Sequence, residues 1–360
     1  MDGRTTRALL LSLLCSLLLA PVAGCFPEGE GDGADGGGGL DASLDAGPGD
    51  GGDQSDAGED GGAADAGAGD GGDDGGTAAA DPGAAGPFPH TLLTDSVTRG
   101  GRTIAVAAYL PTRSSLSHLI LFLPGFQLES SRYAAHCEHL ASQGFAVVRA
   151  DPPAALFSVS HTEMRDDGIA VLDWAFATFG ATLTGEVGVG GHSLGGKVAT
   201  MIAAADGRVS ALLALDPVNG GDPISGYTAE LPDIVPDLTS TLTIPVGYLG
   251  ETTNGTGGGL SPACAPLDQN FQTFYESSTG APWAAEWTLE GADHMDFVHD
   301  VSGCGFVCTA CPDGTADTAA VQATTDLLGA AFFRRHLDGE AAMDPYLVGA
   351  ALPAGVTLRF

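Results

Sequence analysis

The chain has 360 residues, with 46 acidic and 13 basic side chains and a formal net charge of -33 at pH 7. This charge argues against nucleic-acid binding and against electrostatic docking on anionic lipid, because phosphate groups repel so acidic a surface. The length allows one large domain preceded by segments of different composition.

The first 25 residues predict a bacterial lipoprotein signal peptide. Arg4 and Arg7 precede an apolar run at residues 8–20, which is too short for a membrane span of about 20 residues. The run ends in Val-Ala-Gly-Cys25, which resembles a lipobox, so we expect a lipidated Cys25 at the mature N-terminus. The alternative is an ordinary signal peptide in which Cys25 is incidental. The lipobox interpretation predicts an exported lipoprotein at the periplasm or cell surface, whose only membrane contact is the N-terminal lipid anchor.

Residues 26–86 consist almost entirely of Gly, Ala and Asp and have hardly a large apolar side chain. Such a segment cannot bury enough apolar surface to offset the entropy lost on ordering, so it predicts a disordered acidic tether. Residues 87–360 remain as one folded domain, which still carries 29 acidic and 11 basic side chains.

Hydrophobic patterning predicts alternating strands and helices in this domain. The expected strands are residues 103–110, 119–123, 145–150, 186–190, 209–215, 243–249 and 283–289, and the expected helices are residues 133–143, 167–179, 195–206 and 318–337. The alternation predicts an α/β fold with a doubly wound, mostly parallel sheet and helices on both faces. Ligands bind such sheets at the carboxyl ends of the strands.

The segment Gly191-His-Ser-Leu-Gly195 has the pattern of a nucleophile elbow. Small residues two positions before and after a serine allow a tight turn from strand to helix, which exposes the hydroxyl. We therefore predict Ser193 as a nucleophile and the N–H of Leu194 as one donor to an oxyanion. His192 is expected to shape the elbow rather than to transfer protons.

A serine nucleophile needs an imidazole base and a carboxylate that orients it, in the chain order Ser, acid, His for this type of sheet. Asp216 follows the expected strand at residues 209–215, and His294 lies in a loop after the last expected strand. Glu251, after the strand at residues 243–249, is the alternative acid. Asp216 precedes a proline, so capping a turn is the other role open to it.

The loop after residues 119–123 supplies the second expected oxyanion donor. Its sequence is Pro124-Gly-Phe-Gln, and the glycine lets the backbone turn so that the N–H of Phe126 faces the site. A plain strand-ending turn is the alternative. Beside His294, residues 295–300 are expected to begin a helix, and Asp293 and Asp296 to face solvent or cap it.

Five cysteines lie in the folded domain, at positions 137, 264, 304, 308 and 311. In an exported chain they indicate disulfides with one cysteine unpaired. A metal or iron–sulfur site at residues 304–311 is the alternative. We expect no metal and no cofactor.

Several of these segments together resemble the chlorophyllase family and its bacterial relatives, over about residues 117–300. The segments are residues 121–127, 140–148, 191–197, 215–220, 264–266, 274–276 and 294–296. The resemblance implies an α/β-hydrolase carboxylesterase with Ser193, Asp216 and His294 as its catalytic triad, and it favours Asp216 over Glu251. The chain also resembles platelet-activating-factor acetylhydrolases, which place the acid after the same strand.

Two residues beside the expected oxyanion hole depart from the plant chlorophyllase pattern. Leu194 stands where the plant proteins have arginine, and Pro124 where they have histidine. From the order of Ser193, Asp216 and His294, the expected function is a cofactor-independent serine hydrolase of small-molecule carboxylic esters, acting as a monomer. The alternatives are a lipase or cutinase-like polyester hydrolase and, from another class, a non-catalytic surface binding protein on a hydrolase scaffold.

Overall fold

The computed structural model of the chain describes residues 81–154, 159–222, 224–257 and 262–360. The expected signal peptide with Cys25, and the expected tether as far as residue 80, lie outside these residues. Residues 81–86, which their composition assigns to the tether, are instead held against helix α2 (Ala134–Ser142). The N–H of Gly86 donates to the Ser142 hydroxyl, and the side-chain amide of Gln143 donates to the Ala84 carbonyl. The folded domain therefore begins before residue 87.

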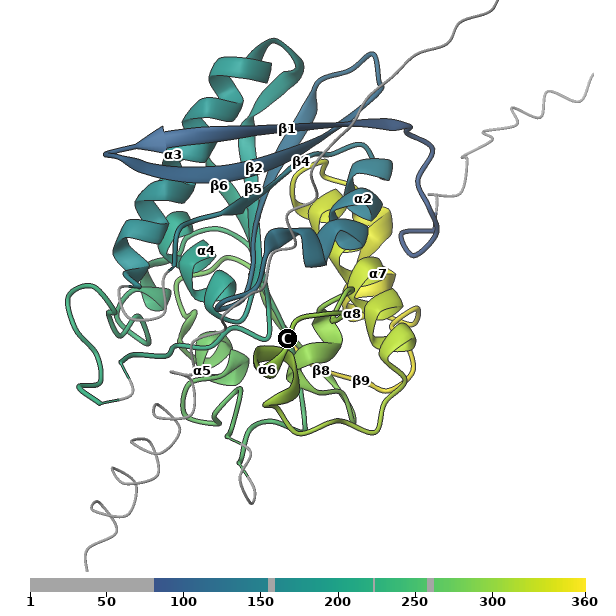
Figure 1. Cartoon of the computed structure of the whole chain (residues 1–360). Coiled ribbons are helices and arrows are strands. Elements are labelled where there is room, and N and C mark those ends of the chain that lie inside the picture. The colour runs from purple at the N-terminus through teal and green to yellow at the C-terminus, as the bar shows by residue number, and fades with distance from the viewer. Residues whose placement is uncertain (1–80, 155–158, 223, 258–261) are drawn as a thin grey trace, which may run out of the picture. The chain divides into compact units, whose positions relative to one another are not determined.

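The described residues form a nine-stranded sheet in the order β1-β2-β4-β3-β5-β6-β7-β8-β9 (Figure 1). The central six strands, β4, β3, β5, β6, β7 and β8 in this order, pair in parallel. Strands β1, β2 and β9 add antiparallel pairs at the two edges. The strands are His90–Arg99, Arg102–Pro111, Ser117–Leu123, Ala146–Asp151, Leu183–His192, Val209–Leu215, Val246–Glu251, Ala284–Leu289 and Val356–Arg359. All seven expected strands are present, and β1 and β9 are additional.

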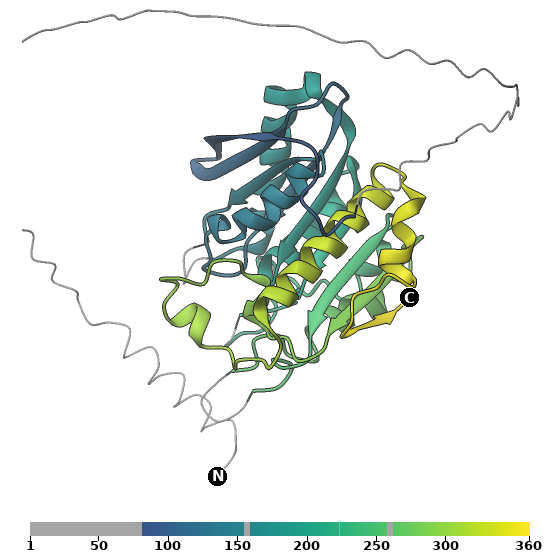
Figure 2. The ribbon, with the colours of Figure 1, turned by 90° about the vertical axis from the view of Figure 1, so that its right-hand side faces the viewer.

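Helices cover both faces of the sheet. One hydrophobic cluster packs the sheet against α3 (His161–Phe179), α4 (Leu194–Ala205) and α5 (Phe271–Ser277). The second cluster packs the opposite face against α2, α7 (Thr318–His336) and α8 (Asp344–Val348), and Figure 2 shows α7, in yellow, lying across this face. The short helix α6 is Phe306–Thr309, and 3-10 helices are Ser130–Tyr133, Gly180–Thr182, Thr239–Thr241, His294–Phe297 and Ala341–Met343. The expected doubly wound arrangement is confirmed.

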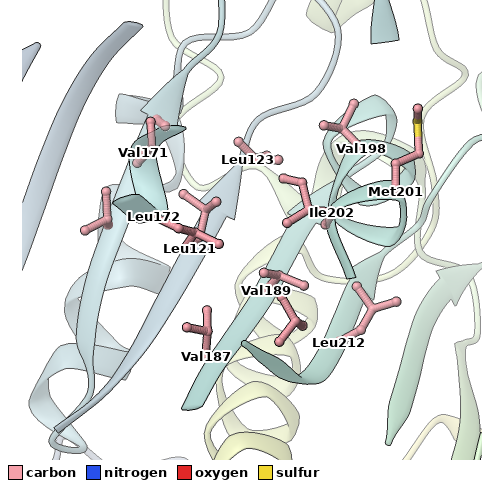
Figure 3. Close-up of a cluster of buried hydrophobic side chains, with 14 of the residues drawn as sticks. Leu121, Leu123, Val171, Leu172, Val187, Val189, Val198, Met201, Ile202 and Leu212 are labelled. Carbon is pink, nitrogen blue, oxygen red and sulfur yellow. The ribbon is translucent and has the colours of Figure 1, made fainter. Parts of the chain in front are cut away.

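The first cluster fixes the helix that carries the elbow. Leu121 of β3, Val189 of β5 and Ile202 of α4 are fully buried, and Figure 3 shows them among the side chains between these elements. Burial of each such side chain stabilises the fold by about 1.5–3 kcal/mol. Helix α3 approaches α4 at Gly168, where an added Cβ would lie 2.4 Å from Cδ1 of Ile202. The position of α4 is thus set by packing against the sheet and α3.

Two arginines attach the β1–β2 hairpin to α3. Nε of Arg99 lies 2.9 Å from Oδ1 of Asp167, and Nη2 of Arg102 lies 2.6 Å from Oδ2. Asp167 is fully buried, so its carboxylate requires these charged partners. This pair of contacts holds an edge hairpin whose first strand is largely exposed.

The described cysteines form the disulfides Cys264–Cys311 and Cys304–Cys308, and Cys137 is free and buried. The expectation of disulfides with one unpaired cysteine is confirmed. Within the same described ranges, no helix has the length and apolar character needed to cross a membrane.

Candidate active site

Ser193 lies in a strained turn between β5 and α4. Its backbone has φ 55° and ψ -121°, a conformation that residues other than glycine seldom adopt. A Cβ on Gly191 would lie 2.5 Å from the carbonyl carbon of Gly195, and a Cβ on Gly195 would lie 2.2 Å from the carbonyl oxygen of Leu123. Only glycine fits at both positions, which is why the strand and helix can meet at the serine.

The fold brings the three predicted triad residues together. Nε2 of His294 lies 3.0 Å from the Ser193 hydroxyl oxygen, and Nδ1 lies 2.6 Å from Oδ2 of Asp216. All three side chains are buried. They follow β5, β6 and β8, so the site lies at the carboxyl ends of neighbouring parallel strands, as expected for such a sheet.

Asp216 is placed by the backbone immediately after β6. Its φ is 42°, and its N–H donates to the carbonyl of Leu249 on β7 over 2.7 Å. Complete burial raises the pKa of Asp216, while the hydrogen bond from His294 opposes that rise. The carboxylate thus depends on His294 as its charged or donating partner.

The alternative acid, Glu251, ends β7 and is also buried. Its Oε2 accepts backbone N–H groups of its own loop, from Thr253 and, at 2.7 Å, from Asn254. Burial, followed by the negative charge of Asp216, raises the pKa of Glu251 to about 8. Nδ1 of His294 is bonded to Asp216 and not to Glu251, whose carboxyl group favours the protonated form below about pH 8.

The loop that holds His294 is stabilised by aspartates and an asparagine. The His294 N–H donates to Oδ1 of Asn254 over 2.6 Å. Asp293 and Asp296 form a capping box on the 3-10 helix His294–Phe297, and both are buried. The capping role is as expected, but exposure to solvent is not observed. The expected helix over residues 295–300 is reduced to this single turn, since the Val298 backbone is already extended.

The predicted oxyanion donors lie at the start of α4 and in the turn after β3. Leu194 begins α4, so its N–H has no partner within the helix. In the other turn, the Gly125 N–H donates to the Tyr133 hydroxyl over 3.2 Å. Among the described residues, the N–H of Phe126 makes no hydrogen bond, and Phe126 is 36% exposed. The N–H groups of Leu194 and Phe126 are thus available to a ligand.

His192 is fully buried beside the triad. Its Nδ1 lies 2.7 Å from the Tyr133 hydroxyl and its Nε2 lies 2.9 Å from the carbonyl oxygen of His294. Burial, followed by the proximity of His294, lowers the pKa of His192 well below its usual value. A neutral ring held in this way agrees with a shaping role at the elbow. Neither Tyr133 nor Asn254 carries a sequence motif, so sequence reasoning missed both.

The described residues contain no group of three or more His, Cys, Asp or Glu side chains arranged to hold a metal ion. A metal or iron–sulfur site at residues 304–311 was the alternative to disulfides. The three cysteines in this segment are instead bonded in the two disulfides.

The chain is similar to known proteins of one family. A family model described as Chlorophyllase matches residues 93–349. Chlorophyllase-1 of Arabidopsis thaliana is 26% identical over 254 residues, covering 64% of this chain and 76% of the relative. Chlorophyllase-1, chloroplastic, of Citrus unshiu is 26% identical over 242 residues (64% and 72%), and Chlorophyllase-2 of Arabidopsis thaliana is 26% identical over 205 residues (51% and 61%). The resemblance inferred from the motifs is confirmed, and with it the α/β-hydrolase fold.

Proposed function

Because the chain belongs to the chlorophyllase family of α/β-hydrolases, we propose that it is a serine hydrolase of carboxylic esters that acts through an acyl-enzyme on Ser193. The observation that carries the proposal is the hydrogen-bonded series from Ser193 through His294 to Asp216 at the carboxyl ends of the strands. Family membership supports hydrolysis, and the geometry supports the serine mechanism.

In the first half of the proposed reaction, the Ser193 hydroxyl attacks the ester carbonyl while Nε2 of His294 takes its proton. Asp216 holds Nδ1 of the ring, which keeps the unprotonated Nε2 directed at the serine and stabilises the imidazolium that forms. The N–H groups of Leu194 and Phe126 donate to the oxyanion of the tetrahedral intermediate. His294 then protonates the departing alcohol.

In the second half, water attacks the acyl-enzyme and His294 removes a proton from that water. The tetrahedral intermediate collapses, the carboxylic acid leaves, and Ser193 regains its proton. Each step uses side chains and backbone groups of this chain, so the reaction needs no cofactor.

Substitution of Ser193 tests the proposal. We expect Ser193→Ala to lower the turnover of p-nitrophenyl butyrate by roughly 10⁴-fold or more, because the nucleophile is lost. Ser278→Ala is the matched control, since Ser278 is also a buried serine but its hydroxyl bonds to Tyr248. Folded Ser193→Ala protein that keeps the wild-type rate would refute the serine mechanism.

An ester panel tests the substrate class. p-Nitrophenyl esters of increasing acyl length, tributyrin, a polyester film and chlorophyll separate a general carboxylesterase from a lipase, a polyester hydrolase and an enzyme for the pigment ester. A folded wild-type protein that neither turns over any ester nor reacts with a fluorophosphonate would favour the non-catalytic binding protein.

We also propose that the protein is an exported, monomeric lipoprotein anchored through Cys25. The lipobox-like sequence supports the anchor, and the two disulfides support an oxidising compartment. Mass spectrometry of the mature protein is expected to find a lipid on Cys25 at the N-terminus. An unmodified N-terminus at another residue would contradict the proposal.

A further inference from the structure

A continuous series of buried hydrogen bonds joins the two loops on either side of Ser193. It begins at the N–H of Gly125, passes through the hydroxyl of Tyr133 to Nδ1 of His192, and continues from Nε2 of His192 to the carbonyl of His294. Tyr133 and His192 are fully buried. The series thus connects the proposed oxyanion loop with the backbone of the proposed base.

The direction of every bond in this series is determined by its two ends. The carbonyl of His294 can only accept, so Nε2 of His192 carries the hydrogen and Nδ1 is bare. Nδ1 must then accept from the Tyr133 hydroxyl, which leaves the phenol oxygen to accept the N–H of Gly125. A neutral His192 in one tautomer satisfies all three bonds, in agreement with a pKa lowered by burial.

The series also determines which backbone groups remain for the reaction. The N–H of Gly125 is used by Tyr133 and is not available to an oxyanion, whereas the N–H of Phe126, the next residue, makes no hydrogen bond within the described residues. The backbone of His294 is held on both sides, by Asn254 at its N–H and by His192 at its carbonyl. The ring of His192 is also 4.5 Å from the ring of His294, centroid to centroid.

We propose that Tyr133 and His192 are positioning residues that hold the Gly125–Phe126 turn and His294 in a fixed relation to Ser193. This inference rests on the proposed function, because it concerns the geometry of that reaction. Neither residue touches the reacting atoms. Their contribution is the alignment of the oxyanion donor with the base, and misalignment by about 1 Å can cost on the order of 100-fold in rate.

Tyr133→Phe tests the proposal most cleanly, because it removes the hydroxyl and keeps the ring. Tyr248→Phe is the matched control: Tyr248 is also fully buried, and its hydroxyl bonds to Ser278 at 2.9 Å. We expect Tyr133→Phe to lower kcat by about 10- to 100-fold with KM changed less than about twofold. The rate at which a fluorophosphonate labels Ser193 is expected to fall in parallel. Tyr248→Phe is expected to leave both rates within about twofold, although it also removes a buried tyrosine hydroxyl and its hydrogen bond.

A double-mutant cycle with His192→Gln separates positioning from general destabilisation. Because the two residues act in one series, the Tyr133→Phe/His192→Gln variant is expected to lose little more rate than the worse single variant. For Tyr248→Phe and His192→Gln, the fold losses in rate are expected to multiply in the double variant. Urea unfolding of each variant ensures that only folded protein is compared.

The outcomes distinguish this inference from the proposed function. If wild-type protein neither hydrolyses esters nor reacts with the fluorophosphonate, the proposed function fails. If wild-type protein reacts and Tyr133→Phe behaves as Tyr248→Phe does, or the cycle is multiplicative for Tyr133 and His192, the positioning role is overturned while the function stands.

Discussion

Oδ2 of Asp216 lies 2.6 Å from Nδ1 of His294, although the fold offers a second buried carboxyl at Glu251 on the next strand. The difference lies in the backbone. Asp216 leaves β6 with φ 42°, whereas Glu251 turns its carboxylate toward the N–H groups of its own loop. Chain order alone admits either acid, but the hydrogen bond to His294 involves only Asp216.

Substitution of the two acids is therefore expected to give unequal effects. Asp216→Asn keeps the shape of the side chain but offers His294 the wrong hydrogen-bonding group, so kcat should fall by about 10³- to 10⁴-fold. Glu251→Gln, the matched change, should leave kcat within about tenfold, since it does not touch the imidazole. Steady-state kinetics on p-nitrophenyl butyrate measure both, and a larger loss for Glu251→Gln would make Glu251 the acid.

Glu251 should also make stability depend on pH. Its pKa is raised from 4.5 to about 8, so the folded state holds a proton that the unfolded state releases. Between about pH 4.5 and pH 8 the unfolded chain binds fewer protons, and the free energy of unfolding should fall as the pH rises, by up to about 1.4 kcal/mol per pH unit from this group. Urea unfolding of wild type and Glu251→Gln at pH 5 and pH 8 measures it. We expect Glu251→Gln to be more stable relative to wild type at pH 8 than at pH 5. The same difference in unfolding free energy at both pH values would contradict the raised pKa of Glu251.

The Cys264–Cys311 disulfide is expected to support the His294 loop. It closes a separation of 47 residues, next to Pro312, whose carbonyl accepts from Asn254, the residue that holds the His294 N–H. Chain entropy gives about 4 kcal/mol for this bridge and about 2 kcal/mol for Cys304–Cys308, which spans only 4 residues. Urea unfolding of the paired serine variants of each bridge, with kcat measured on the same proteins, should show the larger losses for Cys264/Cys311. Equal losses of stability and kcat in the two pairs of variants would argue against a role of the Cys264–Cys311 disulfide in holding the His294 loop.

The elbow glycines provide a steric test. A Cβ on Gly195 would lie 2.2 Å from the Leu123 carbonyl oxygen and 2.5 Å from that of Pro124, so Gly195→Ala must displace the proposed oxyanion loop. We expect a loss of about 1–3 kcal/mol in unfolding free energy together with a loss of activity. Gly207→Ala is the control, because nothing lies within 4 Å of its Cβ position, and it should change stability by less than about 0.5 kcal/mol. Wild-type activity in Gly195→Ala would contradict the close approach.

Sequence reasoning predicted the seven strands with a clear hydrophobic pattern and the serine at the elbow, because these features are local. It missed β1, since nine of its ten residues are not buried and the strand shows no alternation. It also began α3 six residues late, at Asp167. The cap was present in the sequence: Ser160 accepts the N–H of Glu163, in the spacing of a capping box.

The partners of the triad were beyond sequence reasoning for a different reason. Tyr133 is 59 residues from His192, and Asn254 is 40 residues from His294, so only the packed fold brings them into contact. Disulfide pairing has the same limitation, because neither the identity of the unpaired cysteine nor the pairing of the other four follows from their spacing. The proposed nucleophile lies in a local sequence pattern, whereas the residues that support it are brought together only by the topology.

Peptide mapping of the fluorophosphonate adduct is the most direct test of Ser193 as the proposed nucleophile. After reaction of folded wild-type protein, we expect mass spectrometry to find a stoichiometric adduct on Ser193 that forms as ester hydrolysis is lost, and no adduct in Ser193→Ala. An adduct on another serine, or complete loss of hydrolysis with Ser193 unmodified, would contradict the assignment of Ser193 as the nucleophile.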